Sequence, residues 1–484
     1  MTISGALNNA ISGLRAASKG TELVASNISN ALTPGYGRRE LALSSSRIGD
    51  HGGVQIDGIT RIVNETLAAD RRLAEASNGN TQLRADFFAR VESLLGTPDG
   101  EFSISARLTS FDNSLITAAS RPDAPERLAA VVEEARALAQ SLVDASAGIA
   151  EQRSRADTDI AAQVDQLNMA LQQVQTLNSQ ITSVQVNGGD HAALLDQRQQ
   201  VLDQIGAIVP IRSVPRDNGQ IAIYTEAGAI LLDGRAAEIG FDKVNLVTPY
   251  MSIGAGTLSG LTLNGNPIRT GSDNGALRGG SLGALFAIRD ELGPQVQEQI
   301  DALARDLVER FQDPAVDGTL APGDAGLFTD QGAAFDPLDE LGLASRLSLN
   351  AAVDPRQGGA AWRIRDGINA AAPGDAGDAT LLNALRTTLN AGRVPASGSF
   401  GSGAHSAFDL VSSVTSQFGG ERSRAEQFLS FSTARLNELT QMQLADGVDT
   451  DSELRNLMML EQAYAANARV VEAVDEMMQA IMRL

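Results

Sequence analysis

Apolar residues recur every three or four positions at both ends of the chain. From Ile3 to Leu32 they form one stripe of a predicted helix, and no charged side chain appears before Arg15. The C-terminal segment repeats this spacing at the a and d positions of a heptad, through Leu457, Leu460, Tyr464, Asn467, Val471, Val474, Met478 and Ile481. Each stripe needs another helix to cover it, so the pattern predicts that the two chain ends pair.

The first helix is predicted to end at a defined corner. In the stretch SNISNALTPGYGRRE, small polar residues precede Pro34, which fixes its own φ and pushes Thr33 out of the helical region. Gly35 tolerates a positive φ, so Pro34-Gly35 is typical of a tight turn. The chain is therefore expected to change direction over the turn motif Thr33, Pro34, Gly35 and Tyr36.

Long helices are predicted between the two ends. Helical spacing covers residues 64–95 and 124–186, and the second segment would approach about 90 Å if Gly148 does not interrupt it. From about residue 407 two further helices follow, separated by LADGVDTDSE. The segment 124–186 keeps a seven-residue repeat through Ile160, Val164, Leu167, Leu171, Val174, Asn178 and Ile181.

Strands are predicted where the hydrophobic period changes to two. A short β-like stretch, GGVQIDGITRIV, precedes the helix over 64–95. Between residues 206 and 275, turn signals at Asp217-Asn218-Gly219 and Ala227-Gly228 predict hairpins. Residues 313–405 are mixed, with strands expected near Leu347 and Trp362.

The order of these segments predicts a mainly α fold with a β-rich insert. The N- and C-terminal helices, 1–45 and 445–484, are expected to pair as a coiled-coil-like domain. Residues 46–205 and 276–444 are expected to form a long-helix, rod-like bundle domain with short β elements, and 206–275 a small outer β-rich domain.

Composition narrows the range of functions. The chain of 484 residues carries a net charge of −21, which disfavours nucleic acid and anionic membranes as partners. It contains no cysteine, so disulfides, thiolate metal sites and cysteine nucleophiles are excluded. The opening segment lacks the basic region and contiguous apolar run of a secretory signal peptide. No apolar run approaches the roughly 20 residues of a membrane span.

One stretch resembles a catalytic motif. GGSLG at 279–283 matches the G-x-S-x-G nucleophile elbow, but a loop precedes it where the elbow needs a strand. Ser281 is therefore interpreted as the N-cap of a helix. His51, His191 and His405 lack metal-ligand spacing, so neither a metal site nor a cofactor is predicted.

Two polar features of the C-terminal helix have structural interpretations. Thr450 and Glu453 have the spacing of a capping box that opens the helix. Asn467, at a core position of the heptad, is interpreted as a residue that sets the register of the helix pair. No catalytic residue is predicted.

Motifs at both ends resemble the bacterial flagellar axial proteins. The stretch NISNALTPGYGRRE is similar to that family's N-terminal motif at Asn27, Asn30, Thr33, Pro34, Gly35, Tyr36 and Arg38. The closing helix of the family is matched at Leu460, Gln462, Ala463, Tyr464, Asn467, Ala468 and Met477. Within the family, LLDQRQQVLDQIGAIV, GGSLGALFAIRDEL and GVDTDSEL resemble the hook-associated junction class, and the likeness is weakest over 313–405.

The resemblance implies a structural role without enzymatic activity. Such a protein would join the hook to the filament and template filament assembly. The implied partners are the hook protein, the second junction protein, further copies in a ring, an export chaperone at the C-terminal helix, and the nearby filament cap and flagellin. The implied location is the extracellular hook–filament junction, reached by type III export without a cleaved signal peptide.

The same resemblance implies that the terminal helices pair and line an inner tube. The expected assembly interface places Leu7, Ile11, Leu14 and Ile28 against Leu457, Leu460, Tyr464, Val471 and Val474. The helix would stop at the turn motif in order to fit a tube wall of fixed thickness.

Three alternatives stay open at this point. A hook, rod or filament protein would not explain the long helical segment together with a small β insert. A serine hydrolase would use Ser281. An unrelated coiled-coil adhesin would leave the corner at Pro34-Gly35-Tyr36 unexplained.

Overall fold

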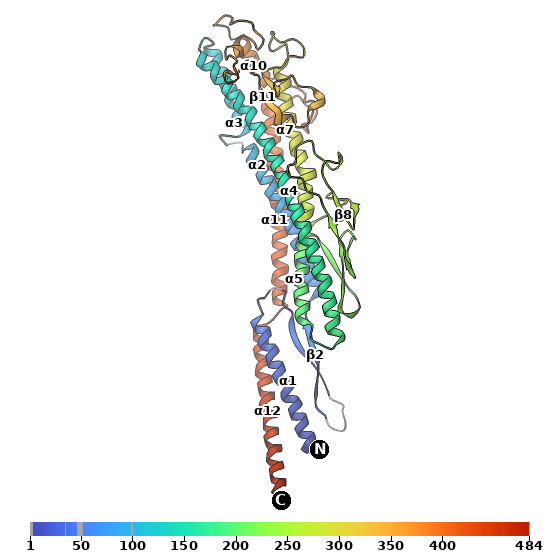
Figure 1. Cartoon of the computed structure of the whole chain (residues 1–484). Helices are drawn as coiled ribbons and strands as arrows, with labels where there is room; N and C mark the ends of the chain where they lie inside the picture. The colour runs from blue at the N-terminus through green and yellow to red at the C-terminus, as the bar shows by residue number, and fades with distance from the viewer. Residues whose placement is uncertain (1–2, 34, 46–51, 98–99, 484) are drawn as a thin grey trace.

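The computed structural model describes residues 3–33, 35–45, 52–97 and 100–483. They form an elongated molecule in which both termini lie at one end (Figure 1). At that end α1 (Ile3–Ser29) lies beside α12 (Thr450–Met482) and runs in the opposite direction. The mainly α fold class with paired terminal helices is therefore confirmed.

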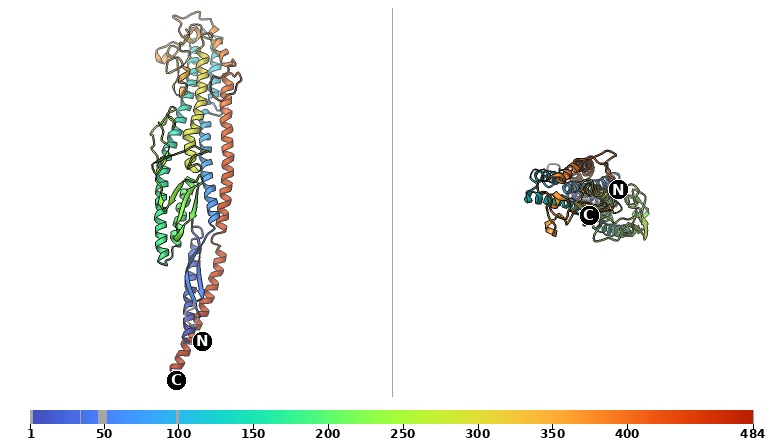
Figure 2. Two further views of the ribbon diagram at one scale, coloured as in Figure 1. Left: turned by 90° about the vertical axis from the view of Figure 1, so that its right-hand side faces the viewer. Right: turned by 90° about the horizontal axis from the view of Figure 1, so that it is seen from above.

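Long helices form the body of the molecule and share one hydrophobic core (Figure 2). They are α2 (Glu65–Leu95), α3 (Ile104–Ser120), α4 (Pro125–Val186), α5 (Ala192–Ile208), α7 (Gly293–Phe311) and α11 (Ala407–Ala445). The seven-residue repeat predicted within α4 is buried at every position, so that prediction is confirmed. The helix α3 was not predicted, although its apolar residues recur every three or four positions and are buried, at Ile104, Leu108, Phe111, Leu115 and Ala118.

The helix α4 is unbroken over 62 residues, about 90 Å at the usual rise per residue. Gly148 does not interrupt it. Because Gly148 has no side chain, Leu94 of α2 packs directly against the α4 backbone. The glycine that made a continuous helix doubtful from sequence is therefore a point of close helix contact.

A β-rich insert follows α5. One antiparallel sheet has the order β3 (Ile211–Pro215), β4 (Ile221–Thr225), β5 (Ile230–Asp233), β6 (Arg235–Ala236), and η1 (Asp217–Gly219) connects β3 to β4. A second has the order β7 (Ile239–Gly240), β8 (Leu261–Leu263), β9 (Asn266–Ile268). The predicted hairpins are confirmed, and the insert lies along one side of α4 (Figure 2).

Asparagines of α4 anchor this insert. Asn178 Nδ2 donates to the carbonyl of Ile221 at 2.9 Å, and Asn168 bonds both the carbonyl and the N–H of Ile239 at 2.8 and 2.9 Å. Because a buried peptide group without a partner is costly, these side chains fix the sheets on the rod.

The chain returns to the body through α6 (Gly280–Ala287), a π-helical turn η2 (Ile288–Leu292) and then α7. Gly280 has a φ of 61°, and a β-carbon there would collide with the carbonyl of Ile208. The N-cap position belongs to Gly279, and Ser281 lies inside the helix. The prediction that Ser281 caps this helix is therefore wrong.

The far end of the rod contains short elements. These are β10 (Phe328–Asp330), η3 (Pro337–Asp339), α8 (Leu343–Arg346), β11 (Leu347–Leu349), η4 (Pro355–Gln357), α9 (Arg363–Asp366) and α10 (Thr380–Asn390). The strand predicted near Leu347 is confirmed, whereas the one near Trp362 is wrong, because α9 begins at the next residue. Around Trp362, backbone bonds of helical type replace a ladder.

A hairpin joins the terminal pair to the body. Its strands are β1 (Arg38–Ser45) and β2 (Val54–Ile62), which pair antiparallel and contact α1. The sequence predicted β2 but not β1, and the hairpin spans the boundary expected at residue 45. Among the described residues, no helix combines the length and the apolar character that crossing a membrane would need.

Candidate functional site

The two terminal helices meet in layers spaced seven residues apart. On α1 the layer positions are Gly13, Gly20 and Asn27, and on α12 they are Asn467, Leu460 and Glu453. A β-carbon at Gly13 would lie 2.7 Å from Asn467 Nδ2, and one at Gly20 would lie 3.0 Å from both methyl carbons of Leu460. This repeat is the coiled-coil spacing, and the glycines allow close approach.

The third layer is polar and buried. Asn27 Nδ2 donates to Glu453 Oε2 at 3.2 Å, and Glu453 is 1% exposed. The carboxylate also accepts a bond from Arg38 Nε at 2.7 Å, and this bond raises the pKa of the Arg38 guanidinium above its ordinary value. Separating a buried ion pair is costly, because it leaves a charge uncompensated. The bond between Arg38 and Glu453 therefore holds the N-terminal end of α12 beside the turn.

Asn27 also holds the chain that leaves α1. Its side-chain oxygen accepts bonds from the Tyr36 hydroxyl at 2.8 Å and from the N–H of Arg39 at 3.0 Å. Its side-chain nitrogen donates to the carbonyl of Arg39 at 2.9 Å. One buried amide therefore ties the end of α1 to the first residues of β1.

On the other side, Asp196 of α5 binds the same segment. It accepts bonds from the N–H of Gly37 at 2.9 Å, Arg39 Nη2 at 2.8 Å and Arg61 Nε at 2.7 Å. The Arg39 guanidinium also lies over the Tyr36 ring at 4.9 Å. Because successive side chains of a strand point to opposite faces, Arg38 reaches the terminal pair and Arg39 reaches the body. We call this cluster (Asn27, Tyr36, Arg38, Arg39, Asp196, Glu453) the polar clasp.

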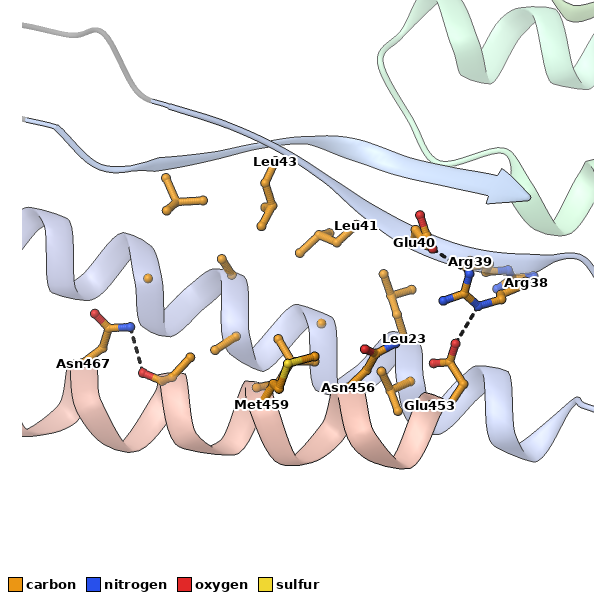
Figure 3. Close-up of a pocket in the computed structure, with 18 residues that line it drawn as sticks. Leu23, Arg38, Arg39, Glu40, Leu41, Leu43, Glu453, Asn456, Met459 and Asn467 are labelled. Atoms are coloured by element: carbon orange, nitrogen blue, oxygen red, sulfur yellow. Dashed lines mark hydrogen bonds and ion pairs between the residues drawn. The ribbon is translucent and has the colours of Figure 1, made fainter. Parts of the chain in front are cut away.

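A largely apolar groove of about 540 Å³ lies between α1, β1 and α12 (Figure 3). Leu23, Leu41, Leu43 and Met459 line it, and Arg38 and Glu453 stand at one end. The terminal pair thus leaves an apolar hollow open between its two helices and the hairpin.

Many apolar side chains of α12 are left uncovered by the described residues. Large apolar side chains of α12 are exposed at Leu454, Met458, Met459, Tyr464, Val470, Met477, Met478, Ile481 and Met482. So many exposed large apolar side chains on one helix indicate an interaction site. The arrangement can bind other helices.

The residues expected to form the assembly interface lie on these elements. On α1, Leu7, Ile11, Leu14 and Ile28 are half-buried. On α12, Leu457, Leu460 and Val471 are half-buried, Val474 is buried and Tyr464 is exposed. Of these residues, Leu460 is the one that the close helix contacts place against α1, at Gly20.

The residues that mark the helix contact on α1 were missed because two of them have no side chain. A search for apolar stripes passes over Gly13 and Gly20. The signal that could have found them is their seven-residue spacing with Asn27.

The turn motif is described except for Pro34, which lies outside the described residues. Gly35 has a φ of 78°, as the turn requires. Thr33 Oγ1 donates to Asn30 Oδ1 at 3.3 Å, and the N–H of Tyr36 donates to the carbonyl of Thr33 at 3.2 Å.

The capping box predicted at the start of α12 is wrong. Asp449 is the N-cap, and its carboxylate accepts the N–H of Asp451 at 3.0 Å. Glu453 binds Arg38 and Asn27 instead of the cap backbone. Glu453 therefore forms the long-range ion pair with Arg38 in place of the local capping hydrogen bond.

Asn467 lies in the helix contact but bonds its own helix. Its Nδ2 donates to the carbonyl of Ala463 at 2.9 Å. Its side chain fills the space above Gly13, so it contributes to the register of the helix pair through its size and not through a hydrogen bond to α1.

The serine of the G-x-S-x-G motif is engaged in packing. Ser281 Oγ donates to Gln163 Oε1 at 3.0 Å and to the carbonyl of Ala207 at 3.2 Å. A nucleophilic serine needs a base that accepts its proton, and neither acceptor is one. Within the described residues no group of acidic or histidine side chains could hold a metal ion, and His51 lies outside them.

Comparisons with known proteins agree with this geometry. A family model described as flagellar hook-associated protein FlgK helical domain matches residues 88–328. The C-terminal model of the flagellar basal body rod FlgEFG proteins matches 441–484, and the flagella basal body rod protein model matches 7–36. The last two cover the helices that pair.

Relatives named flagellar hook-associated protein 1 match along the chain. The Bacillus subtilis protein is 24% identical over 98% of this chain and 97% of the relative. The Escherichia coli protein is 25% identical over 67% of this chain and 59% of its own length. A solved flagellar hook junction protein FlgK from Burkholderia pseudomallei has a TM-score of 0.43, with 19% identity over 54% of this chain and 46% of that one.

The helical-domain model, the two terminal models and the end-to-end relative agree with one another, and the chain belongs to the FlgK family of flagellar hook-associated proteins.

Proposed function

We propose that this chain is a structural subunit of the bacterial flagellum that joins the hook to the filament. The relatives that match it are named hook-associated protein 1. The alternatives, a rod, hook or filament subunit, an adhesin or a hydrolase, have less support, because the helical-domain match covers α4 and the β insert together.

The observation that carries the proposal is the uncovered apolar face of α12. A chain with a net charge of −21 is otherwise well hydrated, yet this helix exposes Met458, Tyr464, Val470 and Met477. Burying such side chains contributes about 1.5–3 kcal/mol each. Neighbouring subunits that cover this face would therefore gain most of their association energy there.

The finer features follow as part of the same proposal. The terminal pair, 1–45 with 445–484, lines the inner tube; the helical domain, 46–205 with 276–444, surrounds it; and the β-rich domain, 206–275, faces outward. The interface residues are Leu7, Ile11, Leu14 and Ile28 with Leu457, Leu460, Tyr464, Val471 and Val474. Copies associate in a ring that binds the hook protein and the second junction protein, and that templates filament growth near the cap and flagellin.

Export belongs to the proposal as well. The chain leaves through the type III channel without a cleaved signal peptide, with a chaperone bound at the C-terminal helix. The apolar face of α12 supports this, because it needs cover before assembly as well as after it. The chaperone and neighbouring subunits then compete for one surface.

A deletion strain tests the proposal. Electron microscopy should show hooks without filaments, and flagellin should accumulate in the medium. Loss of the hooks themselves would mean a rod or hook subunit. Normal filaments would contradict the proposal.

A further inference from the structure

The apolar groove between α1, β1 and α12 is lined by large side chains that the described residues leave uncovered. Leu43 of β1 is 51% exposed and Met459 of α12 is 60% exposed, and both line the groove. In Figure 3, Leu41 and Leu43 point from the strand toward the helices. The groove volume of about 540 Å³ lies within the range of about 300–1,000 Å³ that is usual for binding pockets. The groove is therefore large enough to hold side chains of a partner.

Four charged side chains line the groove, and each is already paired within the chain. Arg38 bonds Glu453 and Glu40, and Arg39 bonds Asp196. The remaining lining residues are apolar or neutral. Burying apolar surface is favourable, whereas burying a charge without a partner is costly. The occupant that fits the groove is therefore apolar and uncharged.

The C-terminal end of α12 extends past α1. Gly13 of α1 faces Asn467 of α12, and the two helices are antiparallel, so Ile3 lies level with Met477. Residues 478–482 extend beyond the described part of α1 (Figure 1). This part of α12 therefore has no described part of α1 beside it.

This helix end has the composition that the groove requires. Its large apolar side chains, Met477, Met478, Ile481 and Met482, are exposed, and residues 477–482 include no charged side chain. Methionine side chains are flexible and fill irregular spaces, which makes them common at binding surfaces. One chain thus carries both an open apolar groove and an uncovered apolar helix end.

The helix end cannot reach the groove of its own chain. The helix α12 is unbroken from Thr450 to Met482, and Leu460 of the same helix lines the groove. At about 1.5 Å per residue, the stretch from Leu460 to Ile481 spans about 30 Å. Another molecule must therefore supply the occupant, and an identical copy carries a suitable helix end.

We propose that the apolar end of α12 (477–482) of one copy docks in the groove of a neighbouring copy in the assembled junction. The inference rests on the self-association in the proposed function. With parallel axes, two docked copies are staggered by about 30 Å. A head-to-tail contact with this stagger does not close on itself, so copies joined in this way wind around the channel in a helix instead of forming a flat ring.

Cross-linking in intact flagella tests the contact. The chain has no cysteine, so Leu43→Cys and Met482→Cys supply its only thiols. Both positions are exposed, so the variants should fold normally. Treatment with a short bis-maleimide should give a ladder of multimers of this protein in denaturing electrophoresis. Each single variant, and Leu43→Cys with Asp378→Cys at the far end of the rod, should give no ladder.

A charge exchange tests the same contact without a reagent. Leu43→Lys and Met482→Glu should each reduce the fraction of cells with attached filaments at least about tenfold, because each places an unpaired charge in an apolar contact. The double variant should restore that fraction, since the two charges then face each other. Gln55→Lys, at an exposed position of β2 outside the groove, is the matched control and should leave attachment unchanged.

The outcomes separate this inference from the proposed function. Filamented junctions that contain the double-cysteine protein but give no ladder would overturn the docking contact alone, and so would a charge pair that fails to restore attachment. A cross-link from the Leu43→Cys variant to a different protein would assign the groove to that protein and overturn the second copy as its occupant. A wild-type protein that is absent from the junctions would overturn both the contact and the proposed function.

Discussion

Gly20 of α1 and Leu460 of α12 meet so closely that a β-carbon on Gly20 would lie 3.0 Å from both methyl carbons of the leucine. The same closeness recurs seven residues away, where Gly13 faces Asn467. The α1 surface is flat at these positions, so the bulk of each layer comes from α12. This asymmetry, with glycines on α1 facing larger side chains on α12, explains how the two helices pair in a fixed register.

We expect Gly20→Leu to force the helices apart. Overpacking of a close contact costs about 1–3 kcal/mol. The variant should lose its terminal pair first, seen as faster proteolysis near residues 20–33, while the melting temperature of the body is unchanged. Ser18→Leu, at an exposed neighbouring position, is the matched control. Equal proteolysis of both variants would contradict the layered contact.

Glu453→Gln should release the start of α12 from the turn. The substitution keeps the shape but leaves Arg38 with only the exposed Glu40 as a charged partner, and loss of a buried pair costs about 3–5 kcal/mol at most. Thr450→Ala should change little, because Asp449 supplies the cap. Chemical denaturation of the two variants decides between them. A larger loss from Thr450→Ala would restore the capping-box interpretation.

Asp196→Asn should uncouple the terminal pair from the body. It removes the charge shared by Arg39 and Arg61, so both guanidinium groups lose their close partner. Hydrogen exchange should increase over β1 and β2 and stay constant in the centre of α4. Gln197→Ala, exposed on the same helix, serves as the control. Unchanged exchange in the hairpin would show that the clasp is not what holds it.

Val470→Asp should block assembly without destabilising the free chain. Val470 is 43% exposed on α12, so a carboxylate there is hydrated until a neighbouring subunit covers it. The unfolding midpoint should remain that of the wild type, while filament attachment in a complemented deletion strain is lost. Glu472→Gln is the control on the same helix. Attachment at the wild-type level would mean that this face stays in water.

Asp301 should make stability depend on pH. Burial raises the pKa of this carboxyl to about 6, although it accepts bonds from the N–H groups of Gly342 and Ala344. A group whose folded pKa is raised contributes stability below its unfolded pKa and loses it as pH rises through the folded value.

Asp301→Asn therefore provides the comparison. Between about pH 4 and about pH 7 the wild type should lose up to about 3 kcal/mol of unfolding free energy relative to the variant. Denaturant titrations at several pH values measure this difference, and other titrating groups cancel. Two curves that stay parallel would contradict the raised pKa.

The sequence predicted those parts of the fold that carry a regular period. The repeat from Ile160 to Ile181 predicted α4, because the positions buried in a helix recur at a regular spacing of apolar residues. The turn residues Asp217-Asn218-Gly219 predicted the hairpin. The strand near Trp362 was wrong because a short helical turn and a short strand have no distinct period.

The polar clasp could not be predicted from the sequence, for a different reason. Glu453 has the local spacing of a capping residue, and its partner Arg38 lies at the other end of the chain. Asp196 likewise accepts hydrogen bonds from Arg39 of β1 and Arg61 of β2. Single-sequence patterns report neighbours along a helix or strand, whereas these bonds depend on how three separate segments meet.

The most direct measurement is an electron cryo-microscopy map of isolated hook–filament junctions. We predict that density for α1 and α12 lines the central channel as an antiparallel pair, with Met458, Tyr464 and Met477 packed against neighbouring subunits. A map that places α12 on the outer surface, with those side chains in solvent, would contradict the account.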